Sequence, residues 1–317
     1  MRVVFMGTPE FAVASLAALL ESDKHQVVGV VTSPDKPAGR GRNLKTSPVK
    51  DYAIRHGLKV LQPSNLKDQG FLTDLAAWRA DLIAVVAFRM LPEAIWSMPS
   101  RGTINLHASL LPRYRGAAPI NWTIIRGDTE TGLTTFYINE AIDEGKVLLQ
   151  ETVRIHEHED AGSLHDRMKD IGAQLLVKTI TDIQEGKVRP LLQDDIGESV
   201  SHAPKLNADN RRIDWNNSAK NIKNLIRGLS PSPSAYSLLK TSGEDEEGLM
   251  VKFFATDGPI GSSLAPGEWK MEGHSELYIG TGDGDLSILD LQVSGKRRLK
   301  VKDLLNGWNP PPGSKFI

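Results

Sequence analysis

The strongest constraint on the fold is the alternation of short apolar runs with helical segments over the first 186 or so residues. The runs are rich in β-branched residues and apolar throughout, which predicts buried strands at residues 2–6, 27–32, 82–87, 103–106 and 133–138. Segments whose apolar residues have helical spacing lie between or after these runs, at residues 9–21, 47–57, 65–79, 117–126 and 163–186. Such alternation favours an open, mostly parallel sheet covered on both faces, so we expect one α/β domain over residues 1–189.

The alternation ends near residue 190, and a polar stretch follows. We interpret residues 190–208 as a linker and residues 209–317 as a second domain. That domain has one amphipathic helix, at about 216–228, and then only extended segments separated by Gly and Pro, at residues 249–255, 276–282 and 286–292. Because helices between these segments are missing, the pattern predicts a small β-barrel with one helix.

Composition narrows the class of protein. The 317 residues, 40% hydrophobic and 24% charged, are typical of a globular chain of two domains. The net charge of -1 excludes a uniformly basic nucleic-acid binder but not local basic patches. Without cysteine, the chain has no disulfides or thiolate metal sites. The first apolar run is too short for a signal peptide and no run approaches the roughly 18 residues of a membrane span, so we expect a cytoplasmic protein that does not enter membranes.

Asn105 and His107 stand two residues apart at the end of the predicted strand at residues 103–106. Because side chains alternate along a strand, the two face the same side of the sheet. In open α/β sheets, ligands bind outside the carboxyl ends of the strands. We therefore expect the amide and the imidazole to point at one ligand atom, although an Asn-x-His sequence at a strand end also fits an ordinary hydrogen-bonded turn.

Asp143 lies in a second loop, residues 139–146, after the predicted strand at 133–138. We expect this acid to meet the imidazole at the same sheet edge. These three side chains suit attack on a carbonyl by a nucleophile that the substrate brings. The Asn would stabilise an oxyanion, the His would carry a proton and the Asp would hold the imidazole. Because no serine stands in a GxSxG motif, the set favours acyl transfer without a covalent enzyme intermediate. Asp-Glu-Gly is also common in simple turns.

Other catalytic motifs are disfavoured. The stretch HEHED at 156–160 lacks HExxH spacing and is typical of a solvated loop, so we expect no metal. The first strand is followed by FMGTPEF without GxGxxG, which disfavours a nicotinamide enzyme, and no P-loop is present.

Two basic clusters stand out in this nearly neutral chain. The first, residues 33–50, is rich in Gly and Pro and is predicted to be a flexible loop rather than a helix or strand; its cations are Lys36, Arg40, Arg42, Lys45 and Lys50. The second lies near the C-terminus and comprises Lys296, Arg297, Arg298, Lys300 and Lys302. One cluster in each predicted domain suggests a polyanion that spans both, although each alone also fits a solvated surface.

These residues together resemble a known family. NLHASLLPRYRGAAPINW at 105–122 with AIDEG at 141–145 is similar to the formyltransferases that use 10-formyltetrahydrofolate. The opening FMGTPEFAV, the basic loop, RIDW at 212–215 and GTGDGDLSILDLQVSGKRRLKVKDLLNG near the end extend the resemblance over nearly the whole chain, and are most similar to members that act on methionyl initiator tRNA.

The resemblance implies a Rossmann-like catalytic domain and an OB-like tRNA-binding domain. It implies formyl transfer to the α-amino group of methionyl initiator tRNA for translation initiation, through a tetrahedral intermediate, by a monomer. Its catalytic positions fall on Asn105, His107 and Asp143. Its folate positions fall on Ser109, Leu110, Leu111, Pro112, Phe88, Arg89, Met90 and Leu91. Its tRNA contacts fall on Arg40, Arg42, Lys45, Lys296, Arg297, Arg298 and Lys300.

Two other functions share part of this pattern. A formyltransferase for an amino sugar nucleotide, glycinamide or another small amine would share the chemistry without needing both basic clusters. A non-catalytic tRNA-binding protein would need the basic clusters but not the Asn, His and Asp set. A formyl-transfer assay that compares tRNA with small amines separates these possibilities.

Overall fold

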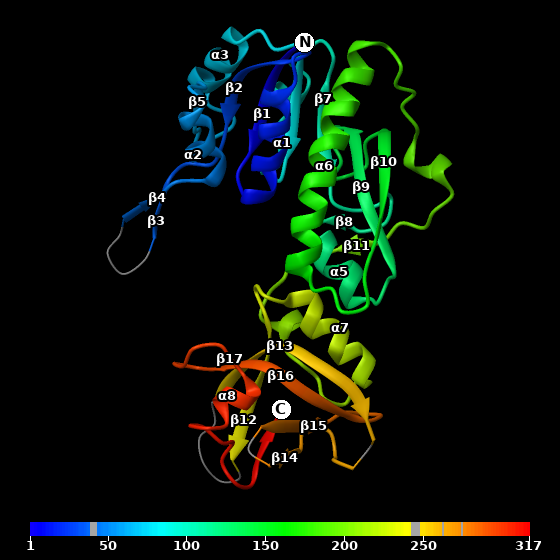
Figure 1. Cartoon of the computed structure of the whole chain (residues 1–317). Coiled ribbons are helices and arrows are strands. Elements are labelled where there is room, and N and C mark those ends of the chain that lie inside the picture. Colours follow the sequence, from blue (N-terminus) through cyan, green and yellow to red (C-terminus); the bar gives the residue numbers. More distant parts are fainter. Residues whose placement is uncertain (39–42, 242–247, 262, 274) are drawn as a thin grey trace. The chain divides into compact units, whose positions relative to one another are not determined.

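The computed structural model describes residues 1–38, 43–241, 248–261, 263–273 and 275–317 (Figure 1). Their contacts divide the chain into two compact units. The N-terminal unit contains Met1–Pro119, Thr131–Arg154 and His165–His202. The C-terminal unit contains Ile120–Glu130, Ile155–Leu164 and Ala203–Ile317. The predicted domain limits at residues 189 and 208 stay predictions.

The N-terminal unit is built on one sheet, and each of the five predicted strands forms part of it. Within the described residues, its seven strands follow the order β10-β9-β7-β6-β1-β2-β5. They are β1 (Arg2–Gly7), β2 (Gln26–Val31), β5 (Val60–Leu61), β6 (Leu82–Val86), β7 (Thr103–His107), β9 (Glu130–Tyr137) and β10 (Val147–Arg154). The pairs from β5 to β7 are parallel, which confirms the predicted fold class.

The five predicted helices of this half of the chain are present. They are α1 (Glu10–Glu21), α2 (Pro48–Arg55), α3 (Gln69–Ala77), α5 (Pro119–Ile125) and α6 (Ala161–Gln184); the short helix α4 (Glu93–Trp96) was not predicted. Short elements connect them: β8 (Arg115–Gly116), the 3-10 helix η1 (Gln193–Ile196) and β11 (His202–Ala203). α2 begins as its sequence predicts, with Pro48 in the first turn and the Ser47 hydroxyl accepting from Lys50 N at 3.0 Å.

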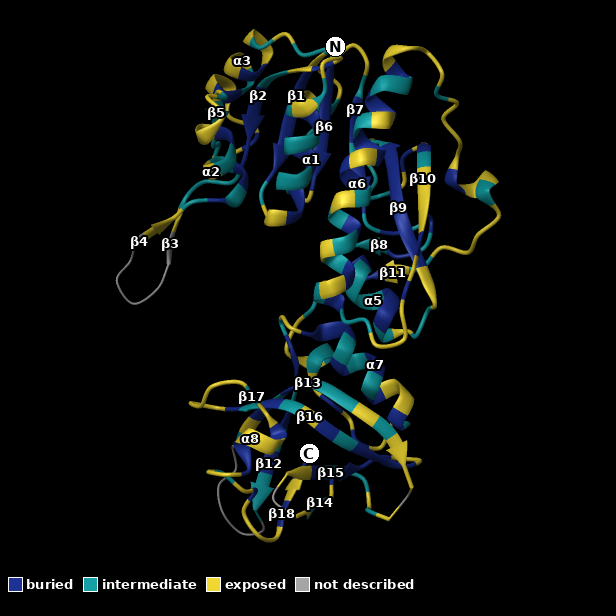
Figure 2. Cartoon of the chain, viewed as in Figure 1, coloured by how far each residue is buried: buried dark blue, intermediate teal, exposed yellow. Residues whose placement is uncertain are grey.

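Helices cover both faces of the parallel strands, and the central strands β1 and β6 are almost entirely buried (Figure 2). On β1, Val4 and Met6 face a core that includes Phe71 and Leu75 of α3. α1 contacts β1, β2 and β6. Because the covered strands cannot present side chains to solvent, ligands can reach the sheet only at its ends.

One strand direction differs from the prediction. β9 is antiparallel to β7, with Ile104 opposite Tyr137 and His107 opposite Thr134. The end of β9 therefore lies beside the start of β7. The prediction that the loop with Asp143 leaves the sheet at the same edge as His107 was wrong. The connection from β7 to β9, residues 108–129, returns the chain to the edge where β7 ends, so β9 starts beside the end of β7 and runs back along it.

The basic loop at residues 33–50 is more regular than predicted. β3 (Lys36–Ala38) and β4 (Asn43–Lys45) form an antiparallel hairpin that projects from the sheet, and α2 begins at Pro48 (Figure 1). The prediction of a loop without strands was wrong, because the backbone of Lys36–Ala38 pairs with that of Asn43–Lys45. Arg40 and Arg42 lie outside the described residues.

The C-terminal unit is an antiparallel sheet with one long helix, as the sequence predicts. Its helices are α7 (Ala219–Leu229), the short α8 (Val301–Leu304) and the 3-10 helix η2 (Asp209–Arg211). Its strands are β12 (Ala235–Thr241), β13 (Leu249–Ile260), β14 (Trp269–Glu272), β15 (Glu276–Gly280), β16 (Asp285–Val293), β17 (Leu299–Lys300) and β18 (Ser314–Phe316). Phe316 N donates to Gly267 O at 2.9 Å, so β18 returns beside the residues that precede β14 and the sheet curls.

An aromatic cluster fills the core of this unit. Phe253 makes edge contacts with Trp215 and Phe316, with ring centroids 5.5 and 5.6 Å apart. α7 closes the core with Ile222 and Ile226, both buried. The α5 region also belongs to this unit, since the Asn121 side chain donates to the carbonyl of Gly228 in α7 at 2.8 Å.

Candidate active site

Asn105 and His107 end β7 in the middle of the N-terminal sheet. Asn105 pairs with Val85 of β6 on one side and Phe136 of β9 on the other. The alternation of a strand places Asn105 and His107 on the same face. His107 is only 7% exposed, while Asn105 is partly exposed. The strand therefore holds both groups at its carboxyl end, as the sequence predicts.

The hydrogen bonds of His107 fix which ring nitrogen can exchange a proton. Nε2 lies 2.9 Å from the carbonyl oxygen of Tyr114. Because a carbonyl only accepts, Nε2 carries a hydrogen in both the neutral and the charged ring. Nδ1 faces Oδ2 of Asp143 at 3.8 Å, a distance for an ion pair rather than a direct hydrogen bond. Nδ1 is therefore the nitrogen that can gain and lose a proton beside a carboxylate.

Asp143 reaches this position through the loop between β9 and β10. Its Oδ2 accepts from Gly116 N at 2.8 Å, which orients the carboxylate. Its backbone has φ of 57°, a left-handed conformation that is uncommon for a residue other than glycine. The three predicted catalytic residues are thus brought together, with Asp143 held by backbone contacts rather than by a strand end.

The turn after His107 is tightly packed. Thr134 Oγ1 donates to Ser109 O at 2.6 Å and accepts from Leu111 N at 3.1 Å. Ser109 and Leu111 are at most 1% exposed, and Pro112 is also buried. Leu110 keeps part of its side chain accessible. Of these four predicted folate residues, only Leu110 offers accessible surface, whereas Ser109, Leu111 and Pro112 are buried.

The loop after β6, residues 88–91, presents an apolar surface. Met90 is 68% exposed, whereas Leu91 is buried and Phe88 packs partly into the core. Arg89 is turned to the neighbouring segment, where its guanidinium donates to the carbonyls of Pro63 and Ser64. Burial lowers the pKa of Arg89. Its charge is therefore engaged by the protein itself.

The first basic cluster is anchored at its base. Lys50 forms an ion pair with Asp35, whose carboxylate also accepts from the Gln62 side chain at 2.8 Å. The hydrogen bond from Lys50, followed by that from Gln62, lowers the pKa of Asp35. Lys45 on β4 is exposed, and so is its neighbour Leu44. Lys50 thus holds the hairpin, and of the three predicted tRNA contacts in this cluster only Lys45 is described.

The second basic cluster lies around the β16–β17 turn. Lys296, Arg297 and Lys300 are exposed. Arg298 differs, since its Nε and Nη2 donate to the Asp290 carboxylate and its guanidinium carbon lies 4.1 Å from the centre of the Phe254 ring. The charge of Arg298 is therefore largely compensated, which the sequence alone does not indicate.

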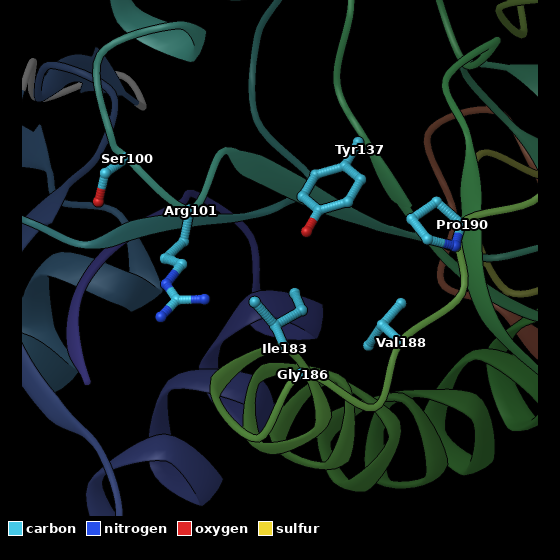
Figure 3. A pocket seen from close by; sticks show the side chains of 7 residues that line it. All are labelled: Ser100, Arg101, Tyr137, Ile183, Gly186, Val188 and Pro190. Atoms are coloured by element: carbon cyan, nitrogen blue, oxygen red, sulfur yellow. The ribbon is translucent and has the colours of Figure 1, made fainter.

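Figure 3 shows a pocket of the N-terminal unit that is distinct from this site. It is lined by Ser100, Arg101, Tyr137, Ile183, Gly186, Val188 and Pro190. Arg101 precedes β7 and Tyr137 lies opposite Ile104, so the pocket belongs to the amino end of β7. His107 is four residues beyond the first residue of β7 and therefore lies roughly 13 Å along the strand, at about 3.3 Å per residue.

Two absences hold for the described part of the chain. No three His, Asp or Glu side chains there gather closely enough to hold a metal ion. No helix there is both long and apolar enough to cross a membrane.

Comparisons with known proteins place this geometry in context. Residues 1–180 match the family described as formyl transferase, and residues 205–309 match the formyl transferase C-terminal domain. A methionyl-tRNA formyltransferase of Bacteroides fragilis is 47% identical over 312 residues, which cover 98% of this chain and 95% of that protein. One of Flavobacterium johnsoniae is 46% identical over 307 residues, covering 97% of this chain and 96% of that protein.

Solved structures agree on the fold. The N-formyltransferase of Helicobacter canadensis, in complex with folinic acid and dTDP-3-aminofucose, has a TM-score of 0.65 and 18% identity, covering 94% of this chain and 99% of that one. At that identity the likeness shows the fold alone. The family match spans both halves of the sequence and the curated relatives are similar over nearly all of it, so the chain belongs to the formyl transferase family.

Proposed function

We propose that the chain transfers the formyl group of 10-formyltetrahydrofolate to the α-amino group of methionyl initiator tRNA. The observation that carries the proposal is the approach of His107 Nδ1 to Asp143 Oδ2 at 3.8 Å, on the strand that also bears Asn105. The relatives named methionyl-tRNA formyltransferase support the same reaction.

The roles of the three side chains follow from their geometry. When the amine nitrogen attacks the formyl carbon, a C–N bond forms and negative charge develops on the formyl oxygen. The Asn105 amide can donate to this oxygen, and protonated His107 stabilises it electrostatically. As the bond to the folate nitrogen breaks, the amine loses a proton and the folate nitrogen gains one. His107 Nδ1, held beside Asp143, is the group that moves this proton.

The donor supplies the activated formyl group, and we place it against the loops that follow β6 and β7. Met90 and the accessible part of Leu110 follow β6 and β7 at the carboxyl edge of the sheet. We assign folate contacts to these two side chains and, more broadly, to the segments 88–91 and 109–112 that carry them. The guanidinium of Arg89 supports the loop from the Pro63 and Ser64 carbonyls instead.

The tRNA acceptor is favoured over a small amine by the basic clusters. The exposed cations Lys45, Lys296, Arg297 and Lys300 suit contacts with phosphates. Binding of a small amine, such as an amino sugar nucleotide or glycinamide, would not require cations on a projecting hairpin and on the C-terminal unit. The alternative therefore has less support, although it shares the chemistry.

The domain roles and cellular setting belong to the same proposal. We assign catalysis to residues 1–189, a connection to residues 190–208 and tRNA binding to the OB-like residues 209–317. The protein would act in the cytoplasm as a monomer, without a membrane partner, and no step is assigned to a metal.

The test is a formyl-transfer assay with 10-formyltetrahydrofolate and three acceptors: methionyl initiator tRNA, free methionine and a nucleotide-linked amino sugar. We expect transfer to the tRNA at least a hundredfold more efficient, in kcat/KM, than to either small amine. The exposed His156 provides a matched control, because His156→Ala should retain activity that His107→Ala loses. Preferred transfer to the amino sugar would refute the tRNA assignment.

Arg40 and Arg42 carry a separate test of the hairpin. A guanidinium makes a planar, forked contact that an ammonium does not reproduce. We expect Arg40→Lys or Arg42→Lys to lower kcat/KM for tRNA although the charge is retained, whereas Arg55→Lys on the exposed end of α2 should not. Wild-type kinetics in both hairpin variants would mean that the hairpin acts through its charge alone.

A further inference from the structure

A glutamine from the predicted linker lies buried against the Asp143 loop. Gln193 begins η1 and is 3% exposed. Its Nε2 donates to the carbonyls of Asp143 and Gly145, at 2.8 and 3.0 Å. Its Oε1 accepts from Nε and Nη2 of Arg115, at 3.0 and 2.7 Å. Both hydrogens of the amide and its oxygen are therefore used in a buried place, where an unmade hydrogen bond is costly.

Arg115 links Gln193 to the segment that contacts the Asp143 carboxylate. Its Nη1 lies 3.0 Å from the Glu144 carboxylate, and the next residue, Gly116, donates its N–H to Asp143 Oδ2. Gln193 therefore binds the backbone of Asp143 directly and, through Arg115, the segment that orients the Asp143 side chain. Few other groups could perform this, because the site requires two donors and an acceptor in one neutral side chain.

The loop needs such a restraint for a physical reason. Asp143 has φ of 57°, and a Cβ on Gly145 would lie 1.6 Å from the Tyr137 carbonyl oxygen. The chain thus takes an uncommon backbone conformation at one residue and a very close approach two residues later. Both persist only where surrounding contacts define them.

We propose that Gln193 is a positioning residue for formyl transfer, which holds Asp143 facing Nδ1 of His107. The inference rests on the proposed catalytic roles of His107 and Asp143. Gln193 itself contacts no reacting atom in this scheme. Its loss lets the Asp143 carboxylate move away from the imidazole, which weakens the stabilisation of the charged ring during transfer while leaving tRNA and folate surfaces in place.

The experiment is a double-mutant cycle. In the wild-type background, Gln193→Ala should lower kcat about tenfold and change KM for tRNA less than twofold. In an Asp143→Ala background, the same substitution should cause less than a twofold further loss, because its effect passes through Asp143. The exposed Gln174 on α6 is the matched control, and Gln174→Ala should retain wild-type kcat.

Gln193→Glu tests the donor group of the amide separately from its acceptor group. A carboxylate still accepts from Arg115 but no longer donates to Asp143 O and Gly145 O, so kcat should fall as far as in Gln193→Ala. This variant keeps the test available if the alanine variant unfolds. A wild-type kcat in a folded Gln193 variant, or losses that simply multiply in the cycle, would overturn the proposal.

An activity-independent readout separates this inference from the proposed function. The imidazole nitrogen resonances of His107 should shift in Gln193→Ala in the same direction as in Asp143→Asn. If the resonances shift but the wild type transfers no formyl group, the positioning stands and the function fails. If the wild type is active and the resonances do not move, Gln193 does not position Asp143.

Discussion

Replacing Asp143 by asparagine tests the central pair of the site with little change in shape. Two unit charges 3.8 Å apart interact with about 1 kcal/mol in bulk water and about 4 kcal/mol at an effective permittivity of 20. The His107 and Asp143 side chains are 8% and 12% exposed, which places the pair between these limits. Taking roughly 2–3 kcal/mol for the charged ring in the transition state, we expect kcat to fall roughly 30- to 160-fold.

The assay is single-turnover formyl transfer with saturating tRNA and folate, so that binding does not contribute. Glu140 provides the control, because it is exposed in the same loop and Glu140→Gln makes the same change of charge. We expect that variant to stay within twofold of wild type. A rate within threefold of wild type for Asp143→Asn, in a folded protein, would mean that the carboxylate charge does not act on the imidazole during transfer.

Three further predictions address the neighbouring parts. Asn105→Ala and His107→Ala should each lower kcat about a hundredfold while equilibrium dialysis still detects folate binding. Gly145→Ala should lower the free energy of unfolding by about 1–3 kcal/mol in a denaturant titration, because a Cβ there overlaps a carbonyl. Lys296→Gln should reduce the slope of log tRNA affinity against log salt by about one. Arg298→Gln should change this slope less, because its charge is paired with Asp290; equal slopes would show that this pair opens on binding.

The sequence predicts the sheet and the catalytic pair because both depend on local pattern. The apolar residues of the runs that become β1, β6 and β7 are buried, which periodicity detects directly. Asn105 and His107 then follow from side-chain alternation alone. Their placement needed no knowledge of which strands are neighbours.

The support around the pair could not be predicted in this way. The carbonyl of Tyr114 binds His107 Nε2, and a backbone group leaves no mark in the sequence. Gln193 falls in a polar stretch that reads as a linker, and its partners lie 48 to 50 and 78 residues away. The pairing of Arg298, just before β17, with Asp290 of β16 likewise depends on a register that only the structure gives. Each of these depends on tertiary contacts rather than on composition or spacing.

The reversed direction of β9 explains why the acid depends on a distant part of the chain. Because Tyr137 lies opposite Ile104, the loop that follows β9 must return roughly 10–13 Å along β7 before Asp143 can face His107. Strand pairing does not hold this loop in place, so hydrogen bonds from other parts of the chain must. Gln193 and Arg115 supply those hydrogen bonds, and Ser201 adds one to Tyr114 N at 2.9 Å, beside the carbonyl that binds His107. A chain ending after α6 would therefore keep Asn105 and His107 on their strand and the Gly116 N–H that binds Asp143, but it would lose the hydrogen bonds made by Gln193 and Ser201.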